Sequence, residues 1–166
     1  MILSKAVDFA RDYHGDQLRK YTNELYIFHP IRVGFMISTS TRSETVIAAA
    51  ILHDILEDTK ATYQDIFNNF GETVAIYVNQ VSNLHKGNRK ERKRLYREQL
   101  LVSYPAVKSI KLADMIDNAP SIIKHDPDFA KVWMAEQKEL LPCLSTGDML
   151  MYMRVKDIID NYFEKT

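Results

Sequence analysis

The chain has 166 residues, 46% of them hydrophobic, and its 22 basic side chains balance 22 acidic ones to give a formal net charge of +0. This length and composition predict one soluble globular domain without an overall field that would draw nucleic acid or an anionic membrane. The single cysteine excludes an intrachain disulfide and fits a reducing cytoplasm. The N-terminus carries charge too early for a signal peptide. The longest apolar run, residues 46–52, is far shorter than the ~20 residues of a membrane span.

The first half of the chain is predicted to be helical, because no stretch alternates apolar and polar residues as a strand does. An amphipathic helix is expected over residues 3–18, with an apolar face formed by Leu3, Ala6, Val7, Ala10 and Tyr13. Residues 19–30 follow as an ordered loop, and Pro30 is suited to open the next helix. A third helix is expected over residues 44–58.

The second half of the chain shows helical patterns as well. Helices are expected, in order, over residues 63–71, 73–84, 90–103, 106–118, 126–141 and 148–163. In the last of these, the methionine-rich run 149–153 is expected to face the core rather than a partner helix. Because no linker or repeat interrupts the chain, we predict a single all-α domain over residues 1–166, a bundle of about eight helices.

A cluster of ionisable residues follows an apolar run in AAAILHDILEDT, residues 48–59. The cluster consists of His53, Asp54, Glu57 and Asp58. Burying such charges costs several kcal/mol unless they are paired or bind a metal. On a continuous helix His53 would share a face with Glu57, and Asp54 with Asp58, whereas adjacent residues diverge by roughly 100°. His53 and Asp54 could then share a metal ion only at a common edge, so other helices would have to complete its ligand shell.

Two further candidates for metal ligands stand elsewhere in the chain. His29 precedes Pro30, and Asp114 lies in IKLADMIDN. Two histidines and two aspartates form a mixed donor set that suits a divalent ion such as Mn²⁺, with positions left open for water. The alternative is a surface pair or a capped core histidine, which is the commoner situation for a lone His-Asp pair.

Five segments, in order, carry a resemblance to a known family: RKYTNELYIFHP, AAAILHDILEDT, FGETVAIYVNQVS, ERKRLYREQL and IKLADMIDN. They resemble the HD-domain phosphohydrolases, and more specifically the hydrolase domain of the RelA/SpoT group and its small single-domain relatives, the alarmone hydrolases. The segments span roughly residues 1–120. The resemblance implies an HD-type helical bundle and a metal-dependent enzyme.

The resemblance also implies roles for individual residues. It implies a metal site, with Mn²⁺ as the expected ion, formed by His29, His53, Asp54 and Asp114. It implies that Glu57 and Asp58 orient or deprotonate the attacking water. Four residues are expected at the nucleotide: Arg19, Lys20, Lys111 and Asn118. Lys111 is expected there because it lies beside Asp114 of the metal site.

The function expected from this resemblance is removal of the 3′-pyrophosphate of guanosine-3′,5′-bis(diphosphate), ppGpp, a small-molecule substrate. Two departures from the family pattern leave the nucleotide open. Residues 23–26, Asn-Glu-Leu-Tyr, stand where the family usually has Gly-x-Pro-Tyr, and Asn can replace Gly in a left-handed turn. Met115 and Asp117 stand where alarmone hydrolases usually carry Arg and His, which removes a cation that could meet a phosphate.

The alternatives are therefore the same chemistry on a ppApp-type nucleotide, NADPH or a nucleoside monophosphate, or a nucleotide sensor without catalysis. The intact pair Glu57 and Asp58 argues against a sensor. Residues 86–97 hold seven Lys/Arg against one Glu, which would either steer a polyphosphate or form a solvated face. Nucleic-acid binding is not expected, oligomeric state is undetermined, and three histidines without partners at ligand spacing are expected in loops or at the surface: His14, His85 and His125.

Overall fold

The computed structural model describes residues 1–165, and its helices form two compact units, Met1–Leu84 and His85 onward. The all-α prediction is confirmed: within the described residues the only β feature is an isolated bridge between Leu18 and Leu25. No helix among residues 1–165 is both long enough and apolar enough to cross a membrane.

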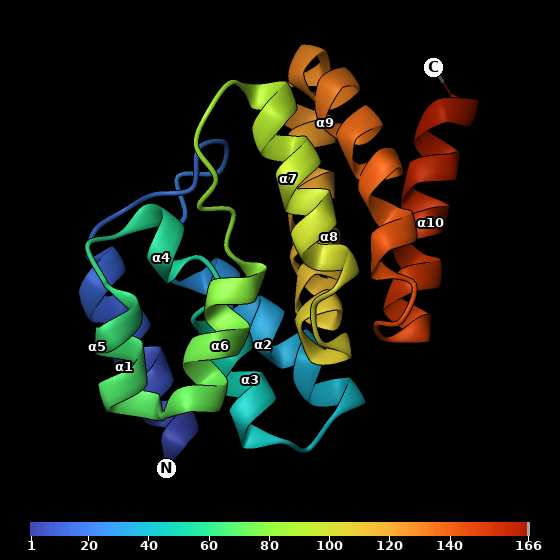
Figure 1. Ribbon diagram of the computed structural model, residues 1–166. Coiled ribbons are helices and arrows are strands. Elements are labelled where there is room, and N and C mark those ends of the chain that lie inside the picture. The colour runs from blue at the N-terminus through green and yellow to red at the C-terminus, as the bar shows by residue number, and fades with distance from the viewer. Residues whose placement is uncertain (166) are drawn as a thin grey trace. The chain divides into compact units, whose positions relative to one another are not determined.

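The first unit contains six helices within its described length (Figure 1): α1 (Ile2–His14), α2 (Phe28–Ser40), α3 (Glu44–Ile51), α4 (Ile55–Asp58), α5 (Tyr63–Phe70) and α6 (Glu72–Val81). Helix α3 is its centre, since it packs against α1, α2 and α6. The sequence explains this position, because three consecutive alanines of α3, Ala48, Ala49 and Ala50, are fully buried. Consecutive alanines point to different sides of a helix, and their small side chains let neighbouring helices pack closely on each of those sides.

Helices α2 and α3 approach most closely at Gly34. A Cβ atom added there would lie 2.5 Å from Cγ1 of Ile51, which is closer than real carbon contacts. Pro30 lies in the first turn of α2, where its missing N–H leaves no helical hydrogen bond unmade. The close contact therefore fixes the start of α2, which carries His29, against the helix that leads into His53.

Two helix boundaries in the first unit differ from the prediction. The first helix ends at His14 rather than residue 18, because Gly15 has a positive φ of 54° and interrupts the helical backbone. The helix predicted over residues 44–58 is not continuous, since residues 52–54 form a turn between α3 and α4.

The second unit contains α7 (Arg89–Leu101), α8 (Pro105–His125), α9 (Pro127–Leu140), the short 3-10 helix η1 (Leu141–Leu144) and α10 (Met149–Glu164). Helix α8 packs against both α9 and α10. It runs seven residues beyond the predicted end at 118, and Pro120 is accommodated in its interior at an exposed position. Helix α10 buries Met151 but exposes Met149, Leu150 and Met153, so the expectation that this run faces the core is wrong for those three side chains.

Candidate active site

The turn at residues 52–54 brings His53 and Asp54 together. Leu52 (φ −101°, ψ 4°) and Asp54 (φ −92°, ψ −6°) both lie near the bridge region of backbone space, where many active-site residues are found. As a result, Nε2 of His53 lies 3.1 Å from Oδ2 of Asp54. On the continuous helix predicted from the sequence the two side chains would diverge by roughly 100°. The helix breaks here, yet the backbone N–H of Asp58 still donates to the carbonyl of Asp54 at 3.0 Å, so these two residues keep the helical spacing that the sequence predicts.

His29, in the first turn of α2, adds a second imidazole to the same carboxylate. Its Nε2 lies 3.3 Å from Oδ2 of Asp54, and its ring centroid lies 5.1 Å from that of His53. His29 is completely buried and His53 is 2% exposed, and each offers a ring nitrogen within 4.8 Å of the other. The first unit thus holds two buried imidazoles and one carboxylate in a single cluster.

The hydrogen bonds of His53 indicate what this cluster binds. Its Nδ1 lies 2.8 Å from the carbonyl oxygen of Ala50, which can only accept, so Nδ1 carries the proton and donates. In the neutral ring Nε2 then presents a lone pair to Asp54, as it does in histidines that bind metals, whose other ring N–H is typically bonded to a carbonyl or carboxylate. A divalent cation satisfies both the lone pairs and the carboxylate, so the donor set fits a metal ion.

Tyr26 and His14 complete the surroundings of Asp54. The Tyr26 hydroxyl donates to Oδ2 of Asp54 at 2.6 Å, and its ring stacks on that of His14 with centroids 4.8 Å apart. Burial alone would raise the pKa of Asp54, but the positive charges that His53 and His29 carry when protonated outweigh it and hold that pKa well below its ordinary value, as a bound cation would also do. Burial and the charges of Asp54 and Asp58 raise the pKa of Tyr26, so its hydroxyl stays a donor.

His14 corrects the expectation of a loop or surface position. It is 6% exposed, and its Nδ1 lies 2.9 Å from Oε1 of Gln17. The signal was present in the sequence, since Ala6, Ala10 and His14 are spaced four apart and all are buried on one face of α1. Tyr13, which was predicted for that face, is 36% exposed. By contrast, His125 is exposed, as expected.

Glu57 and Asp58 lie in the single turn of α4, at the exposed edge of the cluster. Oε1 of Glu57 accepts a hydrogen bond from the backbone N–H of Asn83 at 2.8 Å, which ties this carboxylate to the segment that follows α6. Partial enclosure of the Asp58 carboxyl and the negative charge of Asp54 raise the pKa of Asp58. A carboxyl group whose pKa lies closer to neutral pH is better suited to exchange a proton during a reaction.

The loop before α2 carries Arg19 and Lys20. Its two sides are paired, with the N–H of Arg19 donating to the carbonyl of Glu24 at 2.8 Å, and Asn23 at its tip has a φ of 54°. Asn23 thus adopts the left-handed conformation that the replacement of Gly requires, as predicted. The Arg19 guanidinium lies 5.8 Å from the centroid of the Tyr26 ring, whereas Lys20 is exposed and bonds to the hydroxyl of Tyr21 at 3.0 Å.

The other predicted residues lie on α8, in the second unit. Asp114 is 5% exposed, and its carboxylate accepts from Nζ of Lys111 at 2.7 Å and from Nδ2 of Asn118. The i+3 and i+4 spacing of one helix therefore brings three predicted residues together. Met115 is 2% exposed and lies among the apolar side chains of α8 and α9, so its side chain belongs to the core.

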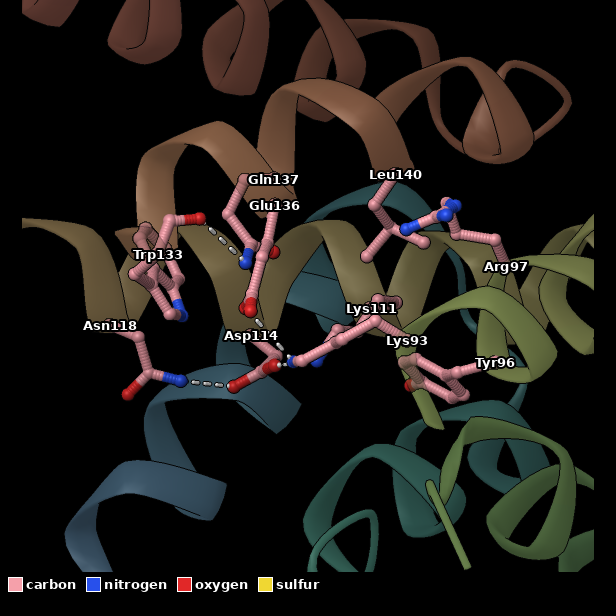
Figure 2. A pocket seen from close by; sticks show the side chains of 10 residues that line it. All are labelled: Lys93, Tyr96, Arg97, Lys111, Asp114, Asn118, Trp133, Glu136, Gln137 and Leu140. Carbon is pink, nitrogen blue, oxygen red and sulfur yellow. Dashed lines mark hydrogen bonds and ion pairs between the residues drawn. The ribbon is translucent and has the colours of Figure 1, made fainter. Parts of the chain in front are cut away.

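A small pocket opens beside Asp114, among α7, α8 and α9 of the second unit (Figure 2). It is lined by Lys93, Tyr96, Arg97, Lys111, Asp114, Asn118, Trp133, Glu136, Gln137 and Leu140. Its cavity volume of about 70 Å³ is far below the roughly 300–1,000 Å³ of pockets that enclose a whole drug-sized ligand. Its closed part therefore has room for a small polar group, and three of its lining side chains are cationic.

The basic stretch 86–97 divides between the pocket and the solvent. Lys93 and Arg97 line the pocket, whereas Arg94 lies on the solvent side and pairs with Glu91 and Glu98. Burial, followed by the charge of Lys111, lowers the pKa of Lys93. Trp133 and Glu136 were not expected at a site, because a helix pattern alone does not show which polar face meets another helix.

The chain is similar to several known proteins. The family model described as an HD domain matches residues 6–139. The guanosine-3′,5′-bis(diphosphate) 3′-pyrophosphohydrolase of Aquifex aeolicus is 39% identical over 72% of this chain and 18% of the relative. Two relatives of that name, MESH1 of Drosophila melanogaster and of Homo sapiens, are 33% and 36% identical over 81% and 76% of this chain, and 75% and 72% of their own lengths.

One solved structure matches nearly the whole chain. It is described as a metazoan orthologue of SpoT that hydrolyses ppGpp, and it superimposes with a TM-score of 0.89 at 27% identity, covering 97% of this chain and 95% of its own. This chain spans about a fifth of the length of the first bacterial relatives that it matches.

Proposed function

We propose that this chain, which belongs to the HD domain family, is a metal-dependent hydrolase that releases pyrophosphate from the 3′ position of guanosine-3′,5′-bis(diphosphate). The convergence of two buried imidazole nitrogens on one Asp54 oxygen is the observation that carries the proposal. The names of the relatives support the choice of nucleotide.

In the proposed site, His29, His53 and Asp54 hold the metal ion. We add Asp114 as a further ligand because of its place in the IKLADMIDN segment, and its bonds to Lys111 and Asn118 are those expected around a ligating carboxylate. When bound, the ion polarises phosphoryl oxygens and makes water a better nucleophile. Nitrogen and oxygen donors together favour Mn²⁺ over the harder Mg²⁺, so Mn²⁺ is the ion that we propose.

The chain's own side chains then have separate tasks. The Tyr26 hydroxyl donates a hydrogen bond to Asp54 and fixes the orientation of that carboxylate. Glu57, anchored on the N–H of Asn83, orients the attacking water, and Asp58 takes up its proton. Two cations in the loop before α2, Arg19 and Lys20, offset the negative charge of the phosphates.

The remaining properties are part of the same proposal. The HD domain match extends over residues 6–139 and so includes segments of both units, which supports one functional domain over residues 1–166. The partner is a small nucleotide, without nucleic acid or membrane, and the single cysteine and neutral charge favour the cytoplasm.

A phosphate-release assay over a panel of nucleotides tests the function. Purified protein is incubated with ppGpp, its adenosine analogue, NADPH and nucleoside monophosphates, in the presence of Mn²⁺, Mg²⁺ or a chelator. We expect pyrophosphate from the 3′-pyrophosphorylated nucleotides with Mn²⁺ and none with the chelator. Release of orthophosphate from a simpler nucleotide alone would instead favour the alternative substrates, in keeping with the altered positions Met115 and Asp117. Binding of ppGpp without any product would indicate a sensor.

A further inference from the structure

Glu136 is a carboxylate placed where an anion-binding site would hold its ligand. It lies on α9 in the wall of the small pocket and is only 15% exposed at its side chain (Figure 2). Arg89 donates to it through two nitrogens, with Nε 2.5 Å from Oε1 and Nη2 2.9 Å from Oε2. Nζ of Lys93 lies 3.3 Å from the same Oε2.

The two cations are one helical turn apart on α7, so their side chains share a face. A guanidinium fork and an adjacent ammonium are the groups with which proteins bind phosphate, and they bind carboxylate with the same geometry. Burial and the positive charges of Lys111 and Arg89 lower the pKa of Lys93, whereas the charge of Glu136 raises it. An anion between Arg89 and Lys93 therefore relieves repulsion among cations at the pocket.

The other acidic partners of α7 differ in position. Arg94 pairs with Glu91 and Glu98 on the outer face of the helix, where both acids are about half exposed or more. Exposed ion pairs of this kind contribute little to the free energy of folding, and these two lie away from the pocket. Glu136 differs because it shares the pocket with Lys111 and Asn118, two of the residues that the sequence predicts at the nucleotide.

We propose that Glu136 is an internal competitor for phosphate: it occupies the anion position between Arg89 and Lys93, and a diphosphate group of the nucleotide binds there only by displacing it. The inference rests on the proposed function for the identity of the nucleotide, but not for the anion site itself. It makes Glu136 a specificity-determining residue. A nucleotide whose diphosphate carries enough charge to displace the Glu136 carboxylate forms ion pairs with both Arg89 and Lys93. A nucleotide without such a group forms neither pair.

Trp133 supplies a direct readout. It is the single tryptophan of the chain and lines the same pocket, so its fluorescence reports binding there. The experiment titrates inorganic pyrophosphate, and separately guanosine and guanosine 5′-diphosphate, into the metal-free protein in a chelator at constant ionic strength. The variants are Glu136→Gln, which keeps the shape but removes the charge, and Glu98→Gln as the matched control on the outer face of α7.

We expect Glu136→Gln to bind pyrophosphate and the diphosphate about 10-fold more tightly, which corresponds to ~1.4 kcal/mol. Its affinity for guanosine should not change, and Glu98→Gln should behave as the wild type. Adding Arg89→Gln to the Glu136→Gln variant should remove the gain, because the freed cation is then missing. Unchanged or weaker pyrophosphate binding by Glu136→Gln would overturn the proposal and leave Glu136 as a link between α7 and α9.

Circular dichroism is recorded in parallel to detect a loss of helix. If Glu136→Gln loses helical signal, Glu136→Asp serves instead, since it keeps the charge but shortens the reach, and it should tighten pyrophosphate binding to a smaller extent. No tightening in that variant would also overturn the proposal. Because the titration uses metal-free protein, a chain that binds pyrophosphate as expected but hydrolyses no 3′-pyrophosphorylated nucleotide would refute the proposed function alone.

Discussion

Asp54 is the residue on which the side chains of the first unit converge. His29, His53 and Tyr26 all place a polar atom within 3.3 Å of its Oδ2. The Tyr26 hydroxyl holds this oxygen in position, and a cation placed there would also meet the ring nitrogens of His29 and His53, which is the preorganisation that a metal site requires. Individual substitutions here should therefore separate metal binding from catalysis.

Replacing His53 with Ala should abolish binding of one divalent ion and leave the helical signal largely intact. The imidazole supplies a donor that Ala cannot replace, whereas the helices around it are held by apolar contacts. Metal content by mass spectrometry, alongside circular dichroism, measures the effect. His125→Ala, at an exposed position, is the control. Full metal content in His53→Ala would show that the ligand assignment is wrong.

Glu57→Gln and Asp58→Asn should retain the metal but lose turnover, because both keep size and remove charge. Loss of a positioned base or acid typically costs ~10²–10⁴-fold in rate. Steady-state kinetics on the nucleotide identified by the panel gives the comparison, with Asp12→Asn on the exposed face of α1 as control. Near-normal kcat in both variants would leave the pair a structural role.

Lys93 should titrate below its ordinary pKa of 10.5, because burial and the neighbouring Lys111 disfavour its charged form. Nuclear magnetic resonance of ¹³C-methylated lysines measures this directly. Glu136→Gln should lower the pKa further, since it removes the charge that opposes the shift. At neutral pH the charging of Lys93 opposes folding, and this cost should fall as pH rises from the lowered pKa towards 10.5. A Lys93 resonance that titrates at or above 10.5 contradicts the inferred burial.

At the scale of elements, the break between α3 and α4 decides the geometry of the cluster. The turn at residues 52–54 turns His53 and Asp54 towards each other, and α2 is packed against α3 closely enough to add His29. Gly34 permits that packing, because any larger residue would meet Ile51. The metal cluster is therefore sensitive to the spacing of two helices as well as to its own residues.

Gly34→Ala should destabilise the fold by about 1–3 kcal/mol, the usual cost of forcing an extra carbon into a packed core. Although Ala is the better helix former, the added Cβ would lie 2.5 Å from Ile51. Urea unfolding measures the free energy of unfolding, and Ser38→Ala, at an exposed position of α2, should stay within about 0.5 kcal/mol of the wild type. Equal stability of Gly34→Ala would show that Ile51 moves aside without cost.

For the molecule as a whole, charge is balanced globally but not locally. The net charge is +0, while residues 86–97 carry seven Lys/Arg. Part of this stretch lines the small pocket and part forms a solvated face. A neutral chain of this kind can still steer an anion over short distances.

The value of kcat/KM should fall as ionic strength rises, because steering is screened over a Debye length of ~8–10 Å. Rates measured between low and high NaCl at fixed Mn²⁺ test this. A kcat/KM independent of salt would limit the role of the basic stretch to solvation.

Arg19→Ala should raise KM more than it lowers kcat, unless Arg19 also stabilises the transition state.

Periodicity and local motifs determined the helical class, most helix positions, the HD family and the order of the candidate ligands. These features depend on residues close in sequence, such as the i+3 and i+4 spacing that brings Lys111 and Asn118 to Asp114. Asn23 was likewise predictable as the left-handed residue of its turn, since few residue types tolerate that backbone.

Tertiary structure alone decided the features that depend on packing between distant segments. The helix predicted over 44–58 breaks within residues 52–54, although no Gly or Pro stands there. The ring of His14 stacks on that of Tyr26, a contact that no helical spacing predicts. Glu136 meets Arg89 across 47 residues of sequence. A helix pattern fixes which side chains share a face, but which face meets which neighbour is set by the shapes and charges of the whole packed unit.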